Sequence, residues 1–519
     1  MKKNFSFHFD ILTLLVCIAG IVLSRFLMNF GLGMLVFRLF FVGSWKEKFE
    51  NIKSQKAILI TILSFFFLHL LGLIWTDNIR FGLDEIVRKI AFLIIPITIL
   101  AISPLKKQTL KYLFWGFLLT IFVGTIWGSI VYFSNPYADP RNLILSTSHI
   151  RFSLNITLAI LILVKIMVVD RKRIKPIFRI LSYVLSLWFL FYLFLTQALT
   201  GIVILSIFLF FYIPYYSIKN KRRKSTILIF TIYIITIVSS LIWVNKEYNF
   251  YFTPNKIYED KLVEKTPDGG RYIHFSENKH IENGNYLYLY FCQDEISQGW
   301  EKRTGLDPTQ YMDAIIRYMN SISPYKDGKR FRELTDNDIE NIKNQIGNKV
   351  YTEKLSLRPR LYSIFLQINS YKVSGSVRGS SELQRLELWK NSLSLMNDNF
   401  FIGTGTGDIA DDFSAKLCER KSDLCDSSLK AHNQYLYIFA SFGVLGFLLF
   451  LIFLFYPPFK LGLFSSYIYF VFFYIIAISM LTEDTLDNLA GIMFFIFINS
   501  ILLFNSKTIK DFIPKRSLR

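Results

Sequence analysis

The sequence predicts an all-α polytopic membrane protein with about twelve transmembrane helices and one large domain outside the membrane. Hydrophobic residues make up 52% of the 519 residues, and Phe alone occurs 52 times. Mean hydropathy is +0.36. Many apolar runs also approach the roughly 20 residues that a helix needs to span the hydrocarbon of a bilayer.

Twelve apolar segments are candidate spans. They lie near residues 9–24, 27–43, 57–75, 86–103, 111–133, 150–169, 178–196, 199–216, 226–244, 434–456, 463–481 and 486–505. The first two are short, and Arg88 and Lys89 weaken the segment 86–103 as a span.

The net charge of +20 indicates membrane topology and not a nucleic-acid partner. Residues 245–433 hold 26 basic and 27 acidic residues, so the excess belongs to the rest of the chain, which holds 33 and 12. The basic residues gather in alternate short loops and in the tail, at 46–56, 106–107, 171–175, 219–224 and 507–519. The intervening loops are poor in Lys and Arg and carry Asp77, Asp139, Glu483, Asp484 and Asp487. The positive-inside rule therefore predicts that both termini are cytoplasmic.

This orientation divides the chain into three parts. An N-terminal bundle of about nine spans covers 1–244, a large external loop domain covers 245–433, and the C-terminal spans with a cytoplasmic tail cover 434–519. About 190 external residues suffice for a domain with its own small core. Within it, 336–344 and 383–396 are predicted to form short amphipathic helices.

The four cysteines show no metal-ligand spacing, so the sequence predicts no metal site. Cys17 lies in the first predicted span and is interpreted as packing. Cys418 and Cys425 lie close together in the external domain, where a disulfide could persist, but two unpaired thiols are equally compatible with the sequence. Cys292 is then left over.

Polar residues at the end of the external domain are candidates for chemistry. His432 stands where this domain meets an apolar run, and an imidazole can gain or lose a proton near neutral pH. Arg378 and Arg385 could each donate paired hydrogen bonds to a diphosphate. The glycine-rich run 403–408 lacks the Lys and Ser/Thr of a phosphate loop and is interpreted as a tight turn between two helices. Taken singly, these residues are more typical of surface charges and a structural histidine.

In order and spacing, these residues resemble the O-antigen ligase and polymerase family. The resemblance consists of an Arg-x-x-x-Trp motif at 385–389, a Gly-x-Gly turn within 403–407, a His-Asn-x-x-Leu motif at 432–436, and a following helix with Gly443 and Gly446. The number of spans and the late external loop agree with the family, although the specific motifs occupy only about 376–446. The long loop, with Asn-Gly at 283–284 and Asp-Gly at 327–328, resembles the Bacteroidetes branch.

The resemblance implies a GT-C-like glycosyltransferase of the bacterial inner membrane with its large loop in the periplasm. The implied reaction is inverting transfer of a glycan from undecaprenyl diphosphate to an acceptor hydroxyl, without a metal or another cofactor. His432 would be the base for the acceptor hydroxyl, and Arg385 would neutralise charge on the departing diphosphate. The implied partners are the lipid-linked glycan, membrane lipid, and either lipid A-core or a nascent polysaccharide as acceptor.

The chain departs from the family at one position. The family usually has a second arginine in the turn that opens the span before a basic cytoplasmic loop, and the matching segment 196–201 has none. Arg151, beside His149, or Arg378 could supply this charge. Arg151 is equally typical of a helix-end residue that reaches the headgroups.

Glu483 and Asn433 are further candidates. Glu483 and Asp484, in the loop before the last span, could orient His432 or bind the acceptor, although a solvated loop is the more ordinary interpretation. Asn433 directly follows His432 and could serve either role.

Ligase and polymerase share donor and leaving group and differ only in the acceptor, and general resemblance slightly favours the ligase. A transporter or flippase for lipid-linked sugar is the alternative of another class. Transporters often have internal repeats and broken helices near the membrane midplane, and the sequence suggests neither. A receptor is disfavoured because no cytoplasmic output domain is present.

Overall fold

The computed structural model describes residues 2–135, 139, 143, 148–168, 174–219, 223–254, 262–278, 280–425, 427 and 429–510. Over these residues the fold is all-α apart from one pair of two-residue strands, β1 (Ile281–Glu282) and β2 (Asn285–Tyr286), so the predicted class is confirmed. Of the predicted basic loops, 169–173, 220–222 and 511–519 lie outside the described residues.

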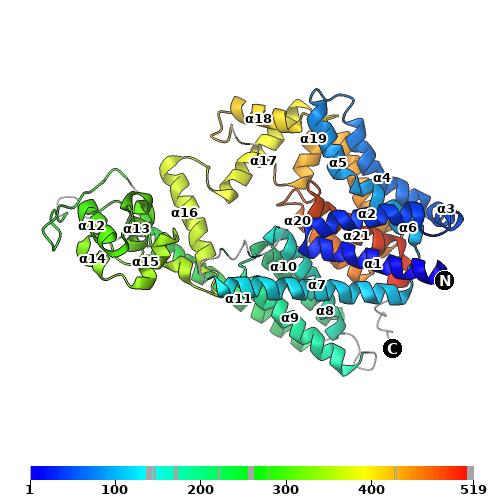
Figure 1. The fold of residues 1–519 in the computed structure, drawn as a ribbon, viewed down its shortest axis with the longest axis horizontal. Coiled ribbons are helices and arrows are strands. Elements are labelled where there is room, and N and C mark those ends of the chain that lie inside the picture. Colours follow the sequence, from blue (N-terminus) through cyan, green and yellow to red (C-terminus); the bar gives the residue numbers. More distant parts are fainter. Residues whose placement is uncertain are drawn as a thin grey trace. The chain divides into compact units, whose positions relative to one another are not determined.

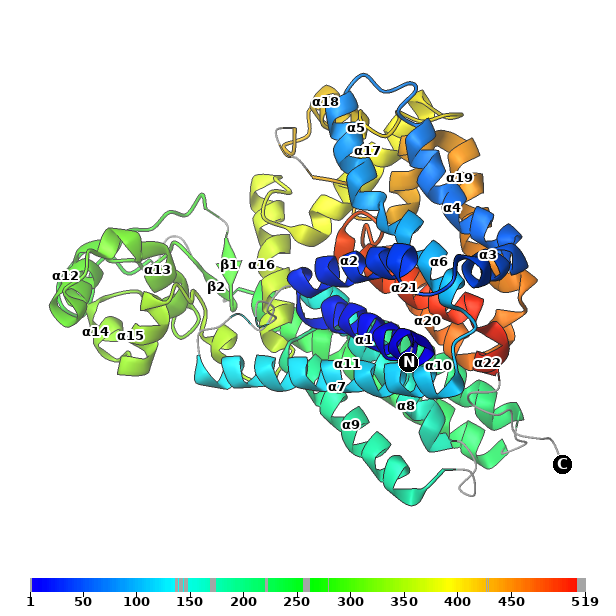
Figure 2. The ribbon, with the colours of Figure 1, turned by 45° about the vertical axis from the view of Figure 1, so that its right-hand side comes forward.

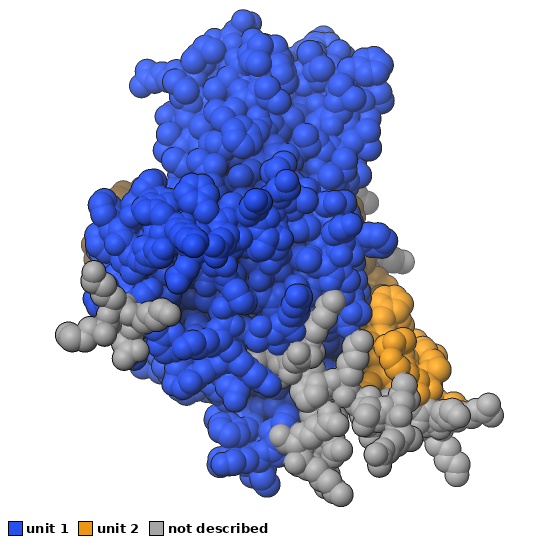
Figure 3. All heavy atoms as spheres, turned by 90° about the vertical axis from the view of Figure 1, so that its right-hand side faces the viewer, with its two compact units in different colours: residues 1–206, 385–519 blue, residues 207–384 orange. Residues whose placement is uncertain are grey.

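The chain forms two compact units, coloured separately in Figure 3. Unit 1 comprises Met1–Ser206 and Arg385–Arg519, and unit 2 comprises Ile207–Gln384. These packing units differ from the predicted division at residues 244 and 433. That division concerned the side of the membrane on which each part lies, and it stays a prediction.

Most helices belong to unit 1 (Figure 1). They are α1 (Lys2–Leu23), α2 (Arg25–Phe41), α3 (Trp45–Ser54), α4 (Lys56–Leu71), α5 (Ile79–Lys89), α6 (Ala91–Ile102), α7 (Lys107–Ser134), α8 (His149–Val168), α9 (Pro176–Leu195), α18 (Ile409–Glu419), α19 (Gln434–Lys460), α20 (Tyr467–Ser479), α21 (Leu489–Phe504) and α22 (Ser506–Lys510). Unit 2 contains α11 (Arg223–Phe252), α12 (Gln293–Thr304), α13 (Met312–Asn320), α14 (Gly328–Arg332), α15 (Asp336–Lys343) and α16 (Arg358–Ser374). Two helices, α10 (Leu199–Lys219) and α17 (Ser381–Asp398), cross the unit boundary.

The protein is a multi-pass membrane protein with fewer full-length spans than the twelve predicted. In the described part of the chain, seven helices are long and apolar enough to cross a membrane, or eight if α2 and α3, bent by 109°, form one span. The seven are Phe5–Leu23, Lys107–Ser134, His149–Met167, Pro176–Leu195, Leu199–Lys219, Ile227–Phe252 and Gln434–Lys460.

Helix length explains the difference. The predicted spans 57–75, 463–481 and 486–505 correspond to α4, α20 and α21, which have only 16, 13 and 16 residues. The predicted span 86–103 is divided between α5 and the 12-residue α6. A 16-residue helix covers about 24 Å, less than the ~30 Å of bilayer hydrocarbon. Of these helices, α21 is buried over most of its length, whereas α4 also exposes Ile60, Phe67 and Leu71.

The core of unit 1 forms around α21. This helix is apolar on all sides, and its side chains Phe494, Phe495 and Phe497 are almost completely buried. It packs against α6, while α1 packs against α2 and α7, and α4 packs against α19 (Figures 1 and 2).

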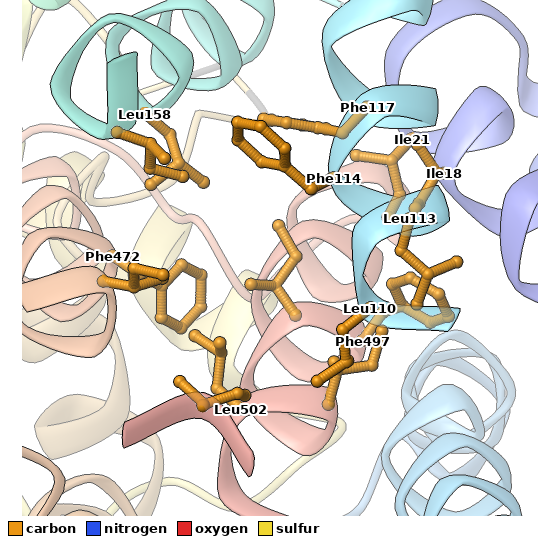
Figure 4. Close-up of a pocket in the computed structure, with 15 residues that line it drawn as sticks. Ile18, Ile21, Leu110, Leu113, Phe114, Phe117, Leu158, Phe472, Phe497 and Leu502 are labelled. Carbon is orange, nitrogen blue, oxygen red and sulfur yellow. The ribbon is translucent and has the colours of Figure 1, made fainter. Parts of the chain in front are cut away.

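An apolar cavity of about 130 Å³ lies among the helices of unit 1. Figure 4 shows side chains of α1, α7, α8, α20 and α21 converging on it, including Phe117, Phe472 and Phe497. All of its lining side chains are hydrocarbon, so it suits an apolar chain and not a sugar or a phosphate. None of the candidate site residues lines it.

Unit 2 has its own hydrophobic core. One cluster surrounds Trp300, Ile315 and Tyr318, and a smaller one joins Tyr251 of α11 to Tyr362 of α16. Of the two predicted amphipathic helices, 336–344 corresponds to α15 and 383–396 to α17, so both are confirmed.

The four cysteines form one disulfide and two free thiols. Cys418 and Cys425 form a disulfide across the end of α18, with their Cα atoms 4.4 Å apart. Cys17 and Cys292 are buried free thiols. The disulfide closes a loop of the chain shortly before His432.

The glycine-rich run connects α17 to α18, as the interpretation of a tight turn requires. It crosses α19 where that helix is broken at Gly443, which has φ 60° and ψ −168°. A Cβ atom on Gly443 would lie 2.3 Å from the carbonyl carbon of Phe401, and one on Gly403 would lie equally close to the backbone of α19. Across the crossing, the Gly405 N–H donates to the Ser441 carbonyl at 2.9 Å. Glycine is needed on both sides because the two backbones touch.

Replacing this glycine is expected to destabilise the protein. Gly443→Ala adds a methyl group at a backbone contact and forces a conformation that L-residues rarely adopt, so the free energy of unfolding should fall by about 2–5 kcal/mol. Gly33→Ala is the matched control, because a Cβ atom there has no neighbour within 4 Å, and it should raise stability by up to about 1 kcal/mol. Unfolding of the purified protein in detergent measures both. Equal stability of the two variants would contradict the close crossing.

Candidate functional site

Charged side chains of unit 1 meet where α5, the start of α8, the α17 helix, the segment before α19 and the loop between α20 and α21 come together. We call this group the polar cluster and the loop, residues 480–488, the acidic loop. The polar cluster consists of Glu85, Lys89, Arg151, Arg385, Lys430, His432, Glu483, Asp484 and Asp487.

The backbone of His432 is held by one carboxylate. The N–H groups of His432 and Asn433 both donate to Asp484, each at 3.0 Å. His432 has a φ of 48°, in the left-handed region, and this pair of bonds stabilises it there. The imidazole Nδ1 lies 3.8 Å from Asp484 Oδ2, beyond hydrogen-bonding distance, and the His432 side chain is 39% exposed. Asp484 therefore fixes the backbone that carries the imidazole ring while leaving the ring itself accessible.

Asn433 begins α19. Its side-chain oxygen accepts hydrogen bonds from the N–H groups of Tyr435 and Leu436, at 3.0 and 3.2 Å, as an N-cap does. In this structure Asn433 is thus engaged in positioning the helix directly after His432.

Burial and neighbouring cations keep the imidazole neutral. Burial lowers the pKa of His432 below its ordinary value of 6.5, and the guanidinium of Arg385 lowers it further. Burial raises the pKa of Asp484 to about 7, and the negative charge of Asp487 adds to the increase. Above pH 7 the pair is therefore a neutral imidazole beside a carboxylate, the form that can accept a proton.

Asp487 ties three segments together. Its carboxylate lies 2.8 Å from Lys430 Nζ and 3.4 Å from Lys89 Nζ. Burial opposes ionisation of Asp487, but Lys89 and Lys430 outweigh it and bring its pKa to about 2. The Lys89 ammonium also donates to the Leu486 carbonyl at 2.8 Å and lies 3.4 Å from Glu85. The acidic loop is therefore anchored to α5 and to the segment before α19.

Two guanidinium groups flank Glu483. Arg385 of α17 donates to its carboxylate at 3.0 Å, and Arg385 is 28% exposed. Arg151, in the first turn of α8, acts electrostatically on the same carboxylate. Burial raises the pKa of Glu483, and both arginines oppose the increase. A Cβ atom on Gly491 would lie 3.5 Å from Arg151 Nε, so this guanidinium lies against the start of α21.

The structure brings five of the predicted site residues into one region of unit 1, although their roles stay predictions. These are His432, Asn433, Arg385, Arg151 and Glu483. Arg378 belongs to unit 2, and its role also stays a prediction.

Four members of the polar cluster were not among the predicted site residues: Glu85, Lys89, Lys430 and Asp487. Lys89 had appeared only as a charge that weakens a span, and a lysine beside an apolar run is itself a signal that it needs a partner. Asp484 was predicted, together with Glu483, to orient His432 or bind the acceptor, and its role in a reaction stays a prediction. Among the described residues, no group of three or more His, Cys, Asp or Glu side chains is arranged to hold a metal ion.

Comparison with known protein families identifies a segment of the chain. Residues 339–451 match the family described as O-antigen ligase, whose members are membrane glycosyltransferases. The matched segment contains Arg385, the glycine-rich run and His432, and it ends before the acidic loop. No curated protein matches the chain. The resemblance drawn from the sequence is confirmed for this segment, while the Bacteroidetes branch stays a prediction.

Removing the shared carboxylate is expected to destabilise the cluster. Asp487→Asn removes one of the two carboxylates that Lys89 and Lys430 share and leaves Glu85 beside both ammonium groups, so the free energy of unfolding should fall by about 1–3 kcal/mol at neutral pH. Because the pKa of Asp487 lies below its ordinary 3.8, this stabilisation is complete above about pH 4 and is lost as the pH falls towards 2.

The matched control is Asp336→Asn, which removes an ion pair with Arg303 at a fully exposed carboxylate and should leave the unfolding midpoint unchanged. Thermal unfolding in detergent compares the two variants. A similar midpoint for both would show that Asp487 does not anchor the acidic loop.

Proposed function

We propose that this multi-pass membrane protein, which carries an O-antigen ligase domain over residues 339–451, transfers a glycan from undecaprenyl diphosphate to a sugar hydroxyl of lipid A-core. The reaction takes place at the periplasmic face of the bacterial inner membrane, where the positive-inside pattern places the acidic loop. The observation that carries the proposal is His432, whose backbone N–H is held by Asp484 and whose imidazole lies within the electrostatic influence of Arg385, both residues belonging to the matched domain.

The residues of the cluster suit an inverting displacement. The Nε2 atom of His432 takes the proton of the acceptor hydroxyl as its oxygen forms a bond to the anomeric carbon of the donor. The bond from that carbon to the phosphate oxygen breaks, and the diphosphate leaves with the electron pair. Asp484 stabilises the imidazolium that forms, as a carboxylate beside a catalytic histidine does.

Arg385 and Arg151 suit the leaving group. A guanidinium remains charged and donates paired hydrogen bonds to phosphate oxygens. Arg385 donates to the Glu483 carboxylate and Arg151 acts on it electrostatically, so a bound diphosphate would compete with this carboxylate for both arginines. The exposed part of Arg385 provides the route for that exchange.

The packing of α8 supports Arg151 as the substitute for the missing turn arginine. The turn 196–201 lies against α8, because a Cβ atom on Gly201 would be 2.9 Å from the Cβ of Ser153. The hydroxyl of Thr157 donates to the Gly201 carbonyl at 3.3 Å. Arg151 therefore stands on the helix that contacts the turn from which the family arginine would extend.

The geometry also bears on the alternatives. The break in α19 at Gly443 was not foreseen, and broken helices are common in transporters. Here, however, the backbone at the break is hydrogen-bonded to residues 400–405. This favours an enzyme over a flippase. A polymerase, with a lipid-linked repeat as acceptor, would use the same cluster.

A deletion strain tests the function. Lipopolysaccharide gels of the ligase-deficient strain should lack every polymer-bearing band, with the polymer still on the carrier lipid. Core carrying a single repeat would instead identify a polymerase, and an unchanged gel would exclude both. His432→Ala should fail to restore the bands although the protein is folded and present in the membrane.

The charge of Arg385 should contribute more to the rate of transfer than the other cations of α17 do. Arg385→Ala is expected to lower the rate of transfer by about 10²–10³-fold, the effect of removing one donor to a developing anion. Lys390→Ala, which removes an exposed cation from the same helix, should leave the rate unchanged. The measurement is transfer in vitro from purified lipid-linked glycan to lipid A-core. Equal rates for the two variants would remove Arg385 from the site.

The transfer rate should depend on two titrations. The active form has neutral His432 and ionised Asp484, so the wild-type rate should fall as the pH drops through about 7, where Asp484 takes up a proton. In Asp484→Asn this decrease of the rate near pH 7 should disappear. The rate should be lower than that of the wild type and should fall only below pH 6.5, as His432 is protonated. Identical pH profiles would show that Asp484 does not control the base.

A further inference from the structure

Unit 2 has a surface groove that no step of the proposed transfer uses. It has a volume of about 540 Å³, within the range of about 300–1,000 Å³ that is common for ligand sites. We call it the aromatic groove. It is lined by His274, Phe275, Ser276, Glu277, Asn278 and Tyr288.

The backbone beneath the aromatic groove is a hydrogen-bonded hairpin. Ile273 pairs with Phe291 in an antiparallel bridge, and the Phe275 N–H donates to the Tyr288 carbonyl at 3.0 Å. The Asn278 N–H closes a turn onto the Phe275 carbonyl at 3.0 Å. The lining side chains are thus held on a paired backbone.

His274 continues the groove into a strip of aromatic rings. Its Nδ1 accepts from the Tyr290 N–H at 3.2 Å, and its Nε2 faces the Val263 carbonyl at 3.0 Å, so both ring nitrogens are engaged and the ring is fixed. The ring contacts Tyr290 edge to face with centroids 5.0 Å apart, and Tyr290 lies 4.9 Å from Tyr325. The rings hold one another in place before any ligand arrives.

Apolar and polar groups are both free to contact a ligand. Phe275 is 51% exposed and meets Tyr288 edge to face, with ring centroids 6.4 Å apart. The side chain of Glu277 is exposed. Among the described residues, neither the Glu277 carboxylate nor the Tyr288 hydroxyl makes a hydrogen bond. The aromatic groove therefore presents a ring face beside unsatisfied hydrogen-bonding groups.

This combination matches a saccharide. A pyranose ring presents C–H groups on one face, which pack on an aromatic ring, and hydroxyl groups around its edge, which bond to carboxylate and amide groups. A purely apolar ligand would desolvate Glu277 and Asn278 without replacing their hydrogen bonds. A phosphate would be repelled by the Glu277 carboxylate.

We propose that the aromatic groove is a carbohydrate-binding site that holds a stretch of neutral sugars of the glycan substrate. The identity of the glycan rests on the proposed function, whereas binding of sugar by the groove does not require catalysis. Affinity gained at this site would lower the KM for a long glycan and leave kcat unchanged, because the groove residues do not touch the reacting atoms.

Binding to the full-length protein in detergent tests the site. The probes are two oligosaccharides released from lipopolysaccharide by mild acid, the core and the polymer chain, each labelled at its reducing end and followed by fluorescence polarisation. Phe275→Ala should weaken binding at least tenfold, and Tyr288→Phe and Glu277→Gln several-fold. Tyr371→Ala, which removes an exposed aromatic ring of unit 2 outside the groove, should bind as the wild type does.

Unfolding midpoints equal to that of the wild type are expected for Phe275→Ala and Tyr288→Phe, because one ring is exposed and the other loses only a hydroxyl. Binding of the core identifies the acceptor as the ligand, and binding of the polymer chain identifies the donor glycan. Wild-type affinity in Phe275→Ala, or no binding of either probe to the wild type, would overturn the inference.

The proposed function and the groove can fail separately. His432→Ala should abolish transfer and bind both probes as the wild type does. Phe275→Ala should raise the KM for long glycan without changing kcat. Loss of transfer in His432→Ala together with unaltered binding in Phe275→Ala would leave the transferase standing and remove only the groove.

Discussion

The site depends on the burial of one carboxylate. Asp487 lies in a place with little water, where an ionised group is stable only beside opposite charge, and Lys89 and Lys430 supply that charge. The resulting ion pairs join α5, the segment before α19 and the acidic loop. Asp484, three residues earlier in the same loop, then reaches the backbone of His432 and Asn433. The position of the imidazole is thus a consequence of an ion pair that does not include it.

The polar cluster contains two kinds of contact, those that hold the backbone in place and those that a ligand could replace. The bonds from Asp484 to two backbone N–H groups are nearly buried and hold the left-handed conformation at His432. The contact between Arg385 and Glu483 is partly exposed, and a dianionic ligand could replace the carboxylate. Rigid support behind His432 and a displaceable counter-ion at Arg385 are what the proposed transfer from a charged lipid would require.

A long glycan needs more than a catalytic centre. Binding energy from parts of a substrate remote from the reacting bond can help to position that bond, and the proposed aromatic groove would offer such contacts. Unit 1 holds the polar cluster on membrane helices, and unit 2 holds the aromatic groove on a hairpin with its own core. The apolar cavity of unit 1 suits hydrocarbon alone, so it differs in chemistry from both the polar cluster and the aromatic groove.

Local sequence patterns were sufficient to predict the fold class of this protein and the family that one segment of it matches. Hydropathy identified a helical multi-pass membrane protein, and the spacing of Arg385, the glycine-rich run and His432 identified the family of residues 339–451. Hydropathy could not separate α4, α20 and α21 from full spans, because an apolar run continues past the residue at which its helix ends. Only the tertiary structure paired Lys89 with Asp487 and placed Arg151 beside Glu483. Charges that stand hundreds of residues apart in sequence meet through helix packing, and no local pattern records which buried cation will neutralise which buried anion.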